Sequence, residues 1–323
     1  RQMCIRDRRS TIQDAISAPK VGGIVRLTRF ILKGTFLIET VGAMLLLPVF
    51  LSDYGLKGVW MAVFHSVSAF CNAGFDILGT PTNPFPSITA YAGNPIVNVV
   101  IMFLIIAGGI GFLTWEDICI NKIHFRKYHM QSKIIVVTTA LLIVLPAVFF
   151  FFSDFTHLSV GKRLLASAFQ AVTPRTAGFN TMDISKMTEV SKAMIIILML
   201  VGGSPSSTAG GMKVTTFAVM ISVAAAVFQK RQNGCFFGRR IDDDTVKNAA
   251  TVFFMYISLF LLGGIAISKL ENLPLVTCLY ESASAVGTVG LTLGITPELG
   301  AISKLILIAQ MYICLLYTSD AAD

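Results

Sequence analysis

Long apolar segments alternate with shorter amphipathic ones along most of the chain. The apolar segments cover residues 30–51, 95–113, 134–152, 193–228, 249–267 and 301–313. A bilayer core of roughly 30 Å takes about 20 apolar residues as helix. The shorter segments, at 59–70, 162–173 and 275–286, would each cover less than about 20 Å at about 1.5 Å per residue and could not cross it. The pattern predicts an all-α membrane protein built from repeated units of span, re-entrant pore helix and span.

Composition agrees with a membrane protein. Hydrophobic residues make up 54% of the chain and charged residues only 14%, whereas soluble domains carry about 25% charged residues. The mean hydropathy is +0.72. A large soluble helical core could not hide so many uncharged segments at once, so we expect a multi-pass membrane protein, with the lipid bilayer as its surroundings.

Most of the lysines and arginines lie in three segments, 1–33, 121–133 and 229–247. The positive-inside rule places these segments in the cytoplasm, and the short helices would then enter from the opposite side. The net charge of +8 therefore reflects topology. Because no aromatic interleaving or binding motif accompanies the charge, no nucleic-acid partner is expected.

The three short amphipathic segments are copies of one motif. Aligned without a gap, residues 64–75 and 280–291 share these pairs: Phe64/Tyr280, His65/Glu281, Ser66/Ser282, Ser68/Ser284, Ala69/Ala285 and Gly74/Gly290. Residues 169–179 fit as a third copy if one residue is dropped, and Gln170 then matches His65. The glycines recur at a spacing of about 100 residues, too long for a solenoid, so each copy belongs to a larger duplicated unit. We expect His65 to make a pore-helix hydrogen bond and not to act as a base.

Each short helix is followed by a turn of polar, small, glycine and bulky residues. These turns are Asn72, Ala73, Gly74 and Phe75; Thr176, Ala177, Gly178 and Phe179; and Thr288, Val289, Gly290 and Leu291. A dehydrated monovalent cation needs oxygen ligands, which main-chain carbonyls supply in potassium filters. Glycine allows the close backbone approach this requires, and the negative C-terminal helix ends would face the cation. We predict a carbonyl-lined cation filter; the alternative is that these glycines only pack helices together.

Two charged residues in apolar surroundings have open interpretations. Arg175 stands beside Gly178, where a single arginine among three copies argues against an anion path; it either braces the filter or pairs with an acid. Glu39 lies inside the first span. A carboxylate in a membrane is a functional candidate, but Glu39 could equally pair with a basic or hydroxyl group on a neighbouring helix.

A polar, glycine-rich loop interrupts the apolar segment 193–228. Its residues of interest are Gly202, Gly203, Ser204, Pro205, Ser206, Ser207, Thr208, Ala209, Gly210, Gly211 and Lys213. These residues cannot hold regular helix, and irregular backbone at membrane depth must be buried in protein or line a watery path. We predict a gate on the cytoplasmic side of the filter, where Lys213 would repel cations. The alternative is a passive break in the helix.

With these motifs, almost the whole chain resembles the superfamily of Trk, Ktr and HKT potassium transporters, most closely the bacterial Ktr-type membrane subunit (KtrB type). The resemblance rests on the three turns with their flanking residues Arg175, Asn180 and Thr292, and on the serine–proline form of the loop. It implies four repeats around one pseudo-fourfold pore, glycine filters that pass K⁺, uptake often stimulated by Na⁺, and a gating loop in the third repeat. It also implies a homodimer docked on a cytoplasmic nucleotide-binding (KtrA-like) regulatory ring.

Only three of the four repeats are present. The expected organisation is a cytoplasmic connector at 1–27, pore repeat two at 28–120, a cytoplasmic loop at 121–133, pore repeat three at 134–228, a second cytoplasmic loop at 229–247 and pore repeat four at 248–313. The opening residues and the tail at 314–323 are uncharacteristic of the family. We interpret both as artefacts on a fragment that lacks the first repeat and would not conduct selectively alone.

The sequence patterns disfavour two other classes of function. A secondary carrier for a small organic solute would use inverted repeats with two matched helix breaks, whereas the chain has same-direction repeats and one large break. An enzyme is not expected, because the four histidines are scattered and no nucleophile motif occurs. The expected ligands are therefore transported K⁺, held only at the filter, with Na⁺ as a candidate co-ion and no organic cofactor.

Overall fold

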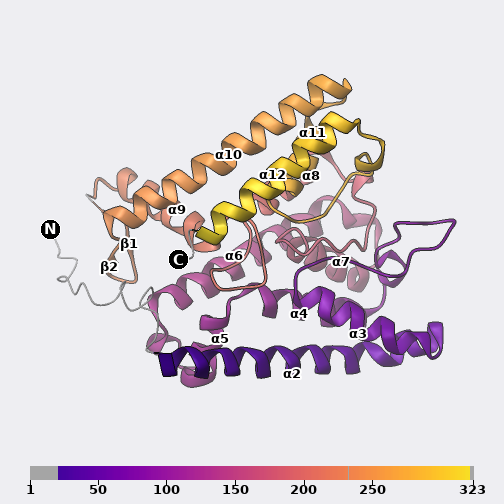
Figure 1. The fold of residues 1–323 in the computed structure, drawn as a ribbon, viewed down its shortest axis with the longest axis horizontal. Coiled ribbons are helices and arrows are strands. Elements are labelled where there is room, and N and C mark those ends of the chain that lie inside the picture. The colour runs from indigo at the N-terminus through magenta and orange to yellow at the C-terminus, as the bar shows by residue number, and fades with distance from the viewer. Residues whose placement is uncertain (1–20, 232, 321–323) are drawn as a thin grey trace.

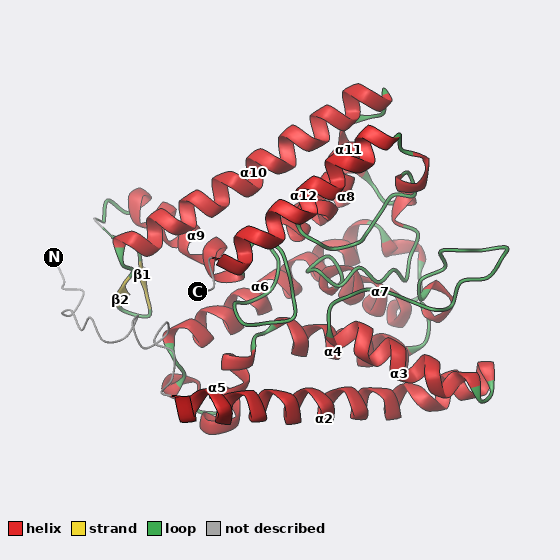
Figure 2. Ribbon diagram, viewed as in Figure 1, coloured by secondary structure: helices red, strands yellow, loops and turns green. Residues whose placement is uncertain are grey.

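The computed structural model describes residues 21–231 and 233–320, so most of the connector at 1–27 and the last residues of the tail lie outside the described part. The described residues are mostly helical, with almost no strand (Figure 2). The helices are α2 (Val21–Tyr54), α3 (Lys57–Phe70), α4 (Pro95–Gly109), α5 (Phe112–Asn121), α6 (Met130–Ser153), α7 (Val160–Val172), α8 (Glu189–Leu200), α9 (Val214–Phe228), α10 (Asp243–Glu271), α11 (Leu275–Val286) and α12 (Ala301–Asp320). Single 3₁₀ turns occupy Thr89–Tyr91, Phe125–Lys127, Phe155–His157, Ile184–Lys186 and Thr296–Glu298.

Three helices of the described residues are each long and apolar enough to cross a membrane: α2 from Arg26 on, α6 and α10. The pair α4 and α5 meets the same test together but bends by 100° at its break. The three predicted pore helices are present as α3, α7 and α11, close to their predicted bounds. The predicted helical membrane architecture is therefore confirmed.

The units pack in chain order. The first span of each unit packs on its pore helix, α2 on α3, α6 on α7 and α10 on α11. The pore helix of the next unit then packs on the second span of the one before, α7 on α4 and α11 on α8. In Figure 1, α2 lies at one edge of the molecule and α10 with α12 at the opposite edge, with α4, α6, α7 and α8 between them.

Both basic loops lie at the same end of the molecule, the end at which α2 begins in Figure 1. The second loop contains an antiparallel hairpin of β1 (Cys235–Phe236) and β2 (Arg239–Arg240). The ring of Phe237 at its tip lies edge-on to that of Phe125 in the first loop, with centroids 6.4 Å apart. The connections from α2 to α3 and from α10 to α11 lie at the other end. Short helices that enter opposite the basic end agree with the charge pattern.

Four details differ from the sequence expectations. Segment 95–113 is not one continuous helix, because the chain breaks between α4 and α5 at Gly111, whose φ is +91°; the described residues thus contain this break as well as the one expected at 202–213. Helix α2 already begins at Val21, inside the predicted connector, and α12 continues past Ile313 to Asp320. The hairpin at 235–240 was not anticipated.

Candidate ion filter and gating loop

The three pore helices end at the turns singled out in the sequence. They contain 14, 13 and 12 residues, so each is about 20 Å long and shorter than a bilayer core. Unpaired carbonyls at a helix C-terminus carry partial negative charge. Each turn therefore lies where a cation is stabilised.

The three turns share one backbone conformation. Positive φ recurs at the first and third position of every turn: Asn72 (50°), Gly74 (67°), Thr176 (68°), Gly178 (83°), Thr288 (54°) and Gly290 (87°). The small residue between them keeps negative φ in each case. Alternation in the sign of φ lets successive carbonyl groups point towards one side of the chain, as in carbonyl-lined ion filters. Left-handed conformations disfavour side chains with a Cβ, and glycine adopts them at little cost.

Although far apart in sequence, the turns lie against one another. A Cβ on Gly74 would overlap the carbonyl oxygen of Ala177 and stand 3.1 Å from the Cα of Gly178. A Cβ on Gly178 would overlap the carbonyl oxygen of Val289. Each glycine thus admits a carbonyl of the next repeat, and the turns stand side by side in chain order.

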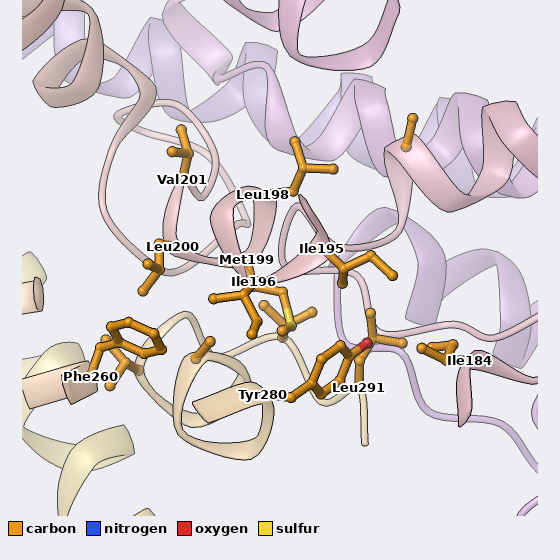
Figure 3. Packing of buried hydrophobic residues seen from close by; sticks show 14 of the residues in the cluster. Ile184, Ile195, Ile196, Leu198, Met199, Leu200, Val201, Phe260, Tyr280 and Leu291 are labelled. Atoms are coloured by element: carbon orange, nitrogen blue, oxygen red, sulfur yellow. The ribbon is translucent and has the colours of Figure 1, made fainter. Parts of the chain in front are cut away.

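The three turns form a series in chain order, and among the described residues the turns at its two ends have no further turn against their outer sides. No heavy atom of the described residues lies within 4 Å of a Cβ built on Gly290. At the other end, the side chain of Phe75 is 68% exposed, whereas its counterparts Phe179 and Leu291 are buried. Figure 3 shows Leu291 beside Tyr280 of α11 and near Ile195 of α8. The series therefore has one open side, between the fourth-repeat turn and the second-repeat turn.

A hydroxyl at or near the C-terminal end of each pore helix holds the turn that follows it. Ser68 donates to the carbonyl oxygen of Phe75 at 2.7 Å, and Thr173 donates to that of Phe179 at 2.6 Å. Ser284, at the same position of the motif, accepts from the backbone N–H of Gly290 at 3.1 Å. The motif thus places a polar side chain behind each turn.

The glycine-rich loop at 202–213 is closed at its base by backbone hydrogen bonds. The N–H of Gly202 donates to the carbonyl of Met212 at 2.8 Å, and the N–H of Val214 donates to that of Gly203 at 2.9 Å. The loop is therefore a compact structure between α8 and α9 and not a frayed helix.

This loop docks into the break between α4 and α5. Ser204 N–H donates to the carbonyl of Gly109 at 3.0 Å, and Thr208 N–H donates to that of Gly108 at 3.2 Å. In return, the N–H of Phe112 donates to the carbonyl of Ser206 at 2.8 Å. The second break, which the sequence did not lead us to expect, supplies backbone partners for the loop.

The loop also reaches two of the turns. Thr208 donates to the carbonyl of Phe70, the last residue of α3, at 2.9 Å and accepts from Asn72 Nδ2 at 3.2 Å. A Cβ on Gly210 would overlap the hydroxyl of Thr288. A cavity of about 340 Å³ is lined by Asn72, Thr208, Ala209, Gly210, Lys213, Thr288 and Leu315. Lys213, whose Nζ donates to Ala209 at 2.9 Å, thus brings its charge to the same cavity as two turns.

Arg175 is buried beside the third-repeat turn. Its Nη2 donates to the hydroxyl of Thr139 at 3.3 Å, and no ion pair to it occurs within the described residues. It lines a small space with Gly109, Val172 and Gly203, where the C-terminal ends of α4 and α7 meet. Because helix C-termini stabilise cations, these ends compensate the guanidinium charge. The sequence analysis offered two interpretations of Arg175, and the described residues do not support the one in which it pairs with an acid.

Glu39 also lacks a basic partner among the residues described. The thiol of Cys71 contacts its carboxylate, with Sγ 4.0 Å from Oε1. The backbone carbonyl of Glu39 accepts from Ser66 of α3 at 2.7 Å. Its contacts therefore attach α2 to the pore helix of its own repeat.

Comparison with known proteins places this architecture in a family. Residues 8–315 match the family model of TrkH, described as a cation transport protein. The potassium/sodium uptake protein NtpJ of Enterococcus hirae is 36% identical over 94% of this chain and 68% of its own length. The Ktr system potassium uptake protein B of Bacillus subtilis is 35% identical with the same coverage.

Structural comparison gives the same result for the fold. The crystal structure of the potassium transporter TrkH from Vibrio parahaemolyticus aligns with a TM-score of 0.71 at 17% identity. The alignment covers 92% of this chain and 63% of that structure, so the chain spans less than two thirds of it. The family resemblance inferred from the motifs is confirmed: the chain belongs to the TrkH family of cation transport proteins and is a multi-pass membrane protein.

Proposed function

We propose that the protein takes up potassium ions across a bacterial cell membrane through a filter formed by the three glycine turns. The main observation behind this proposal is that the three turns share one pattern of φ values. In addition, the glycine of one turn packs against a carbonyl group of the next turn along the chain. The names of two relatives, a potassium/sodium uptake protein and a Ktr potassium uptake protein, support the same ion. Na⁺ is the candidate co-ion.

In this proposal the backbone replaces the hydration shell of the ion. Carbonyls of the turns coordinate dehydrated K⁺, and the C-terminal ends of α3, α7 and α11 offset the cost of holding a charge at membrane depth. The filter residues are those of the three turns at 72–75, 176–179 and 288–291. Hydroxyls behind the turns keep the carbonyls at the spacing that K⁺ requires.

The loop at 202–213 serves as the gate. It is bound to the α4–α5 break and to the C-terminal carbonyl of α3, and it lines the cavity beside two of the turns. The Lys213 ammonium repels cations from that cavity while the loop is docked. Opening requires the loop to leave the α4–α5 break.

The working protein has a fourth unit. The observation behind this proposal is the open side of the series, where nothing lies beside Gly290 among the described residues and Phe75 is exposed. A first repeat with the same motif would pack its carbonyl on Gly290 and its second span on Phe75. We further propose a homodimer on a cytoplasmic nucleotide-binding ring, with the two basic loops, which touch at Phe125 and Phe237, facing that ring.

The test of the transported ion is growth of a potassium-uptake-deficient bacterium that expresses the full-length protein carrying this sequence. Growth at low K⁺ and uptake of Rb⁺ are expected. Gly178→Ser should abolish this uptake or let Na⁺ compete, because its side chain would overlap Val289. The matched control is Gly161→Ser, whose Cβ meets nothing within 4 Å. Absence of K⁺-dependent growth with the wild type in the membrane would refute the proposal.

The gate is tested by weakening the docked loop. Thr208→Val removes the side-chain bonds to Phe70 and Asn72 and should raise uptake, as should shortening 204–210. Thr40→Val is the control, since that hydroxyl bonds only to its own helix at Phe36. Lower or unchanged uptake at normal membrane abundance would leave the loop as a passive break.

A further inference from the structure

Glu281 is a buried carboxylate in the middle of pore helix α11, only 4% exposed. Its Oε1 accepts from the hydroxyl of Thr292 at 2.7 Å and from the backbone N–H of Leu293 at 2.9 Å. Its Oε2 accepts from the hydroxyl of Thr296 at 2.6 Å. All three donors belong to the segment that leaves the fourth-repeat turn, so this one side chain fixes that segment to the helix.

The same helix fixes the inner end of the segment. Ser284 accepts from the N–H of Gly290, and its backbone carbonyl accepts from the N–H of Val289 at 2.9 Å. The hydroxyl oxygens of Thr292 and Thr296 lie 2.9 Å apart, and each directs its single proton to Glu281. The stretch from Val289 to Thr296 is therefore attached to α11 at both ends, with Leu291 between the attachments.

The other repeats do not use this position in the same way. His65, at the equivalent site of α3, has its Nδ1 2.7 Å from the carbonyl of Met61 in its own helix. Gln170, at the equivalent site of α7, is fully buried, and its amide has no hydrogen-bond partner among the described residues. Of the three, the carboxylate alone reaches across to the segment after the turn.

A carboxylate suits this task because it is acceptor-only and its two oxygens can take several donors. Hydrogen bonds to an ionised group are shorter and stronger than neutral ones. Selection of K⁺ over Na⁺ depends on the coordinating carbonyls of the filter. A clamp just beyond Gly290 and Leu291 limits how far those carbonyls can close on a smaller ion.

We propose that Glu281 is a positioning residue for ion selectivity, which acts through its hydrogen bonds to Thr292, Leu293 and Thr296 and not through its charge on the ion. This inference rests on the proposed potassium function. It predicts that selectivity follows the number of these bonds that a variant retains.

The experiment compares variants of the full-length protein by Na⁺ inhibition of Rb⁺ uptake, with protein in the membrane measured in parallel. Glu281→Ala should make Na⁺ about tenfold more effective as a competitor, since it removes charge-assisted bonds. Glu281→Gln should stay within about threefold of the wild type, because the amide oxygen still accepts and its NH₂ can donate to the Thr296 hydroxyl. The Thr292→Val, Thr296→Val double variant should fall between them.

Glu271 provides the matched control. It accepts from Gly300 N–H at 2.8 Å and from the Ser303 hydroxyl at 2.5 Å, at the start of α12 and away from the turns. Glu271→Ala can lower abundance but should leave the Na⁺ competition unchanged.

Unchanged selectivity in Glu281→Ala would overturn the inference. A loss in Glu281→Gln as large as in Glu281→Ala would also overturn it, because the charge would then act on the ion. If Glu281→Ala does not reach the membrane, the double threonine variant decides by the same measure. Failure of the proposed function is a separate result: the wild type would then take up neither K⁺ nor Rb⁺.

Discussion

The third-repeat and fourth-repeat turns have nearly the same backbone but different surroundings. Both have positive φ at their first and third residues, and both follow a pore helix whose hydroxyl holds them from behind. At Gly178 the next turn is in contact, whereas the space beside Gly290 is open within the described residues. The outer end of the third-repeat turn is held by another repeat, and that of the fourth by its own helix.

This difference shows that the duplicated motif determines the backbone conformation of a turn, whereas the surrounding residues determine how the turn is attached. The motif carries the conformation chiefly through its glycine, which adopts positive φ at little cost, while Thr176 and Thr288 hold positive φ despite their β-branched side chains. The attachments differ between repeats: in the third, Asn180 N–H donates to Ser87 Oγ at 2.8 Å, and Ile88 N–H donates to the Asn180 carbonyl at 3.1 Å. Glu281 has that role in the fourth repeat. Similar turns can thus differ in how firmly they are held.

The largest effect is expected from a methyl group at Gly178. Gly178→Ala adds left-handed strain of about 1–2 kcal/mol and also overlaps the Val289 carbonyl. The preference for Rb⁺ over Na⁺ should fall at least about tenfold, since each 1.4 kcal/mol is a factor of ten. In the described surroundings, Gly290→Ala carries the strain alone and should lower the preference about fivefold.

The pair of glycine variants also tests the open side. If Gly290→Ala is as severe as Gly178→Ala in the full-length protein, a further turn packs against Gly290 there. If Gly178→Ala is as mild as Gly161→Ala, the turns do not coordinate the ion and the filter assignment is wrong.

The fold was predictable from sequence where a pattern repeats. Span lengths and the copied motif gave the three pore helices and the position of every glycine turn, because helix length and glycine need are local properties. The α4–α5 break was missed although Gly108, Gly109 and Gly111 stand close together. Glycines at these positions are equally consistent with close packing of helices. The break is favourable because the loop at 202–213 forms hydrogen bonds with it, and this loop comes about 90 residues later in the chain.

Two other features, the hairpin and the role of Glu281, could not be predicted because no local sequence pattern indicates them. The hairpin has a two-residue turn with positive φ at Phe237 and Gly238, a conformation usually signalled by Asn-Gly or Asp-Gly; phenylalanine gave no such signal. The alignment marked Glu281 as polar, but its role depends on Thr292 and Thr296 folding back onto α11. Pairing of that kind is decided by tertiary structure.

A smaller effect is expected from the attachment of the third-repeat turn. Ser87→Ala removes the acceptor of Asn180 N–H but leaves the bond from Ile88. A lost neutral hydrogen bond is worth about 1 kcal/mol, so Na⁺ competition should rise by no more than about fivefold. Ser185→Ala, in an exposed turn beside Asp183, is the control and should behave as the wild type. An effect of Ser87→Ala as large as that of Gly178→Ala would mean that this attachment, and not glycine packing, sets the turn.

The smallest effects are expected from the hydroxyls behind the two turns. Thr173→Val leaves the Phe179 carbonyl without its donor, and Ser284→Ala leaves the Gly290 N–H without its acceptor. Each should lower the free energy of unfolding by about 1 kcal/mol, seen as a fall of about 2–4 °C in the melting temperature of the detergent-solubilised protein. Thr251→Val, whose hydroxyl bonds only to Lys247 of its own helix, should shift it less. Because Glu281 still holds the segment beyond Gly290, Ser284→Ala should affect selectivity less than Thr173→Val. The reverse order would mean that the Glu281 hydrogen bonds do not hold the fourth-repeat turn in place when the Ser284 hydroxyl is lost.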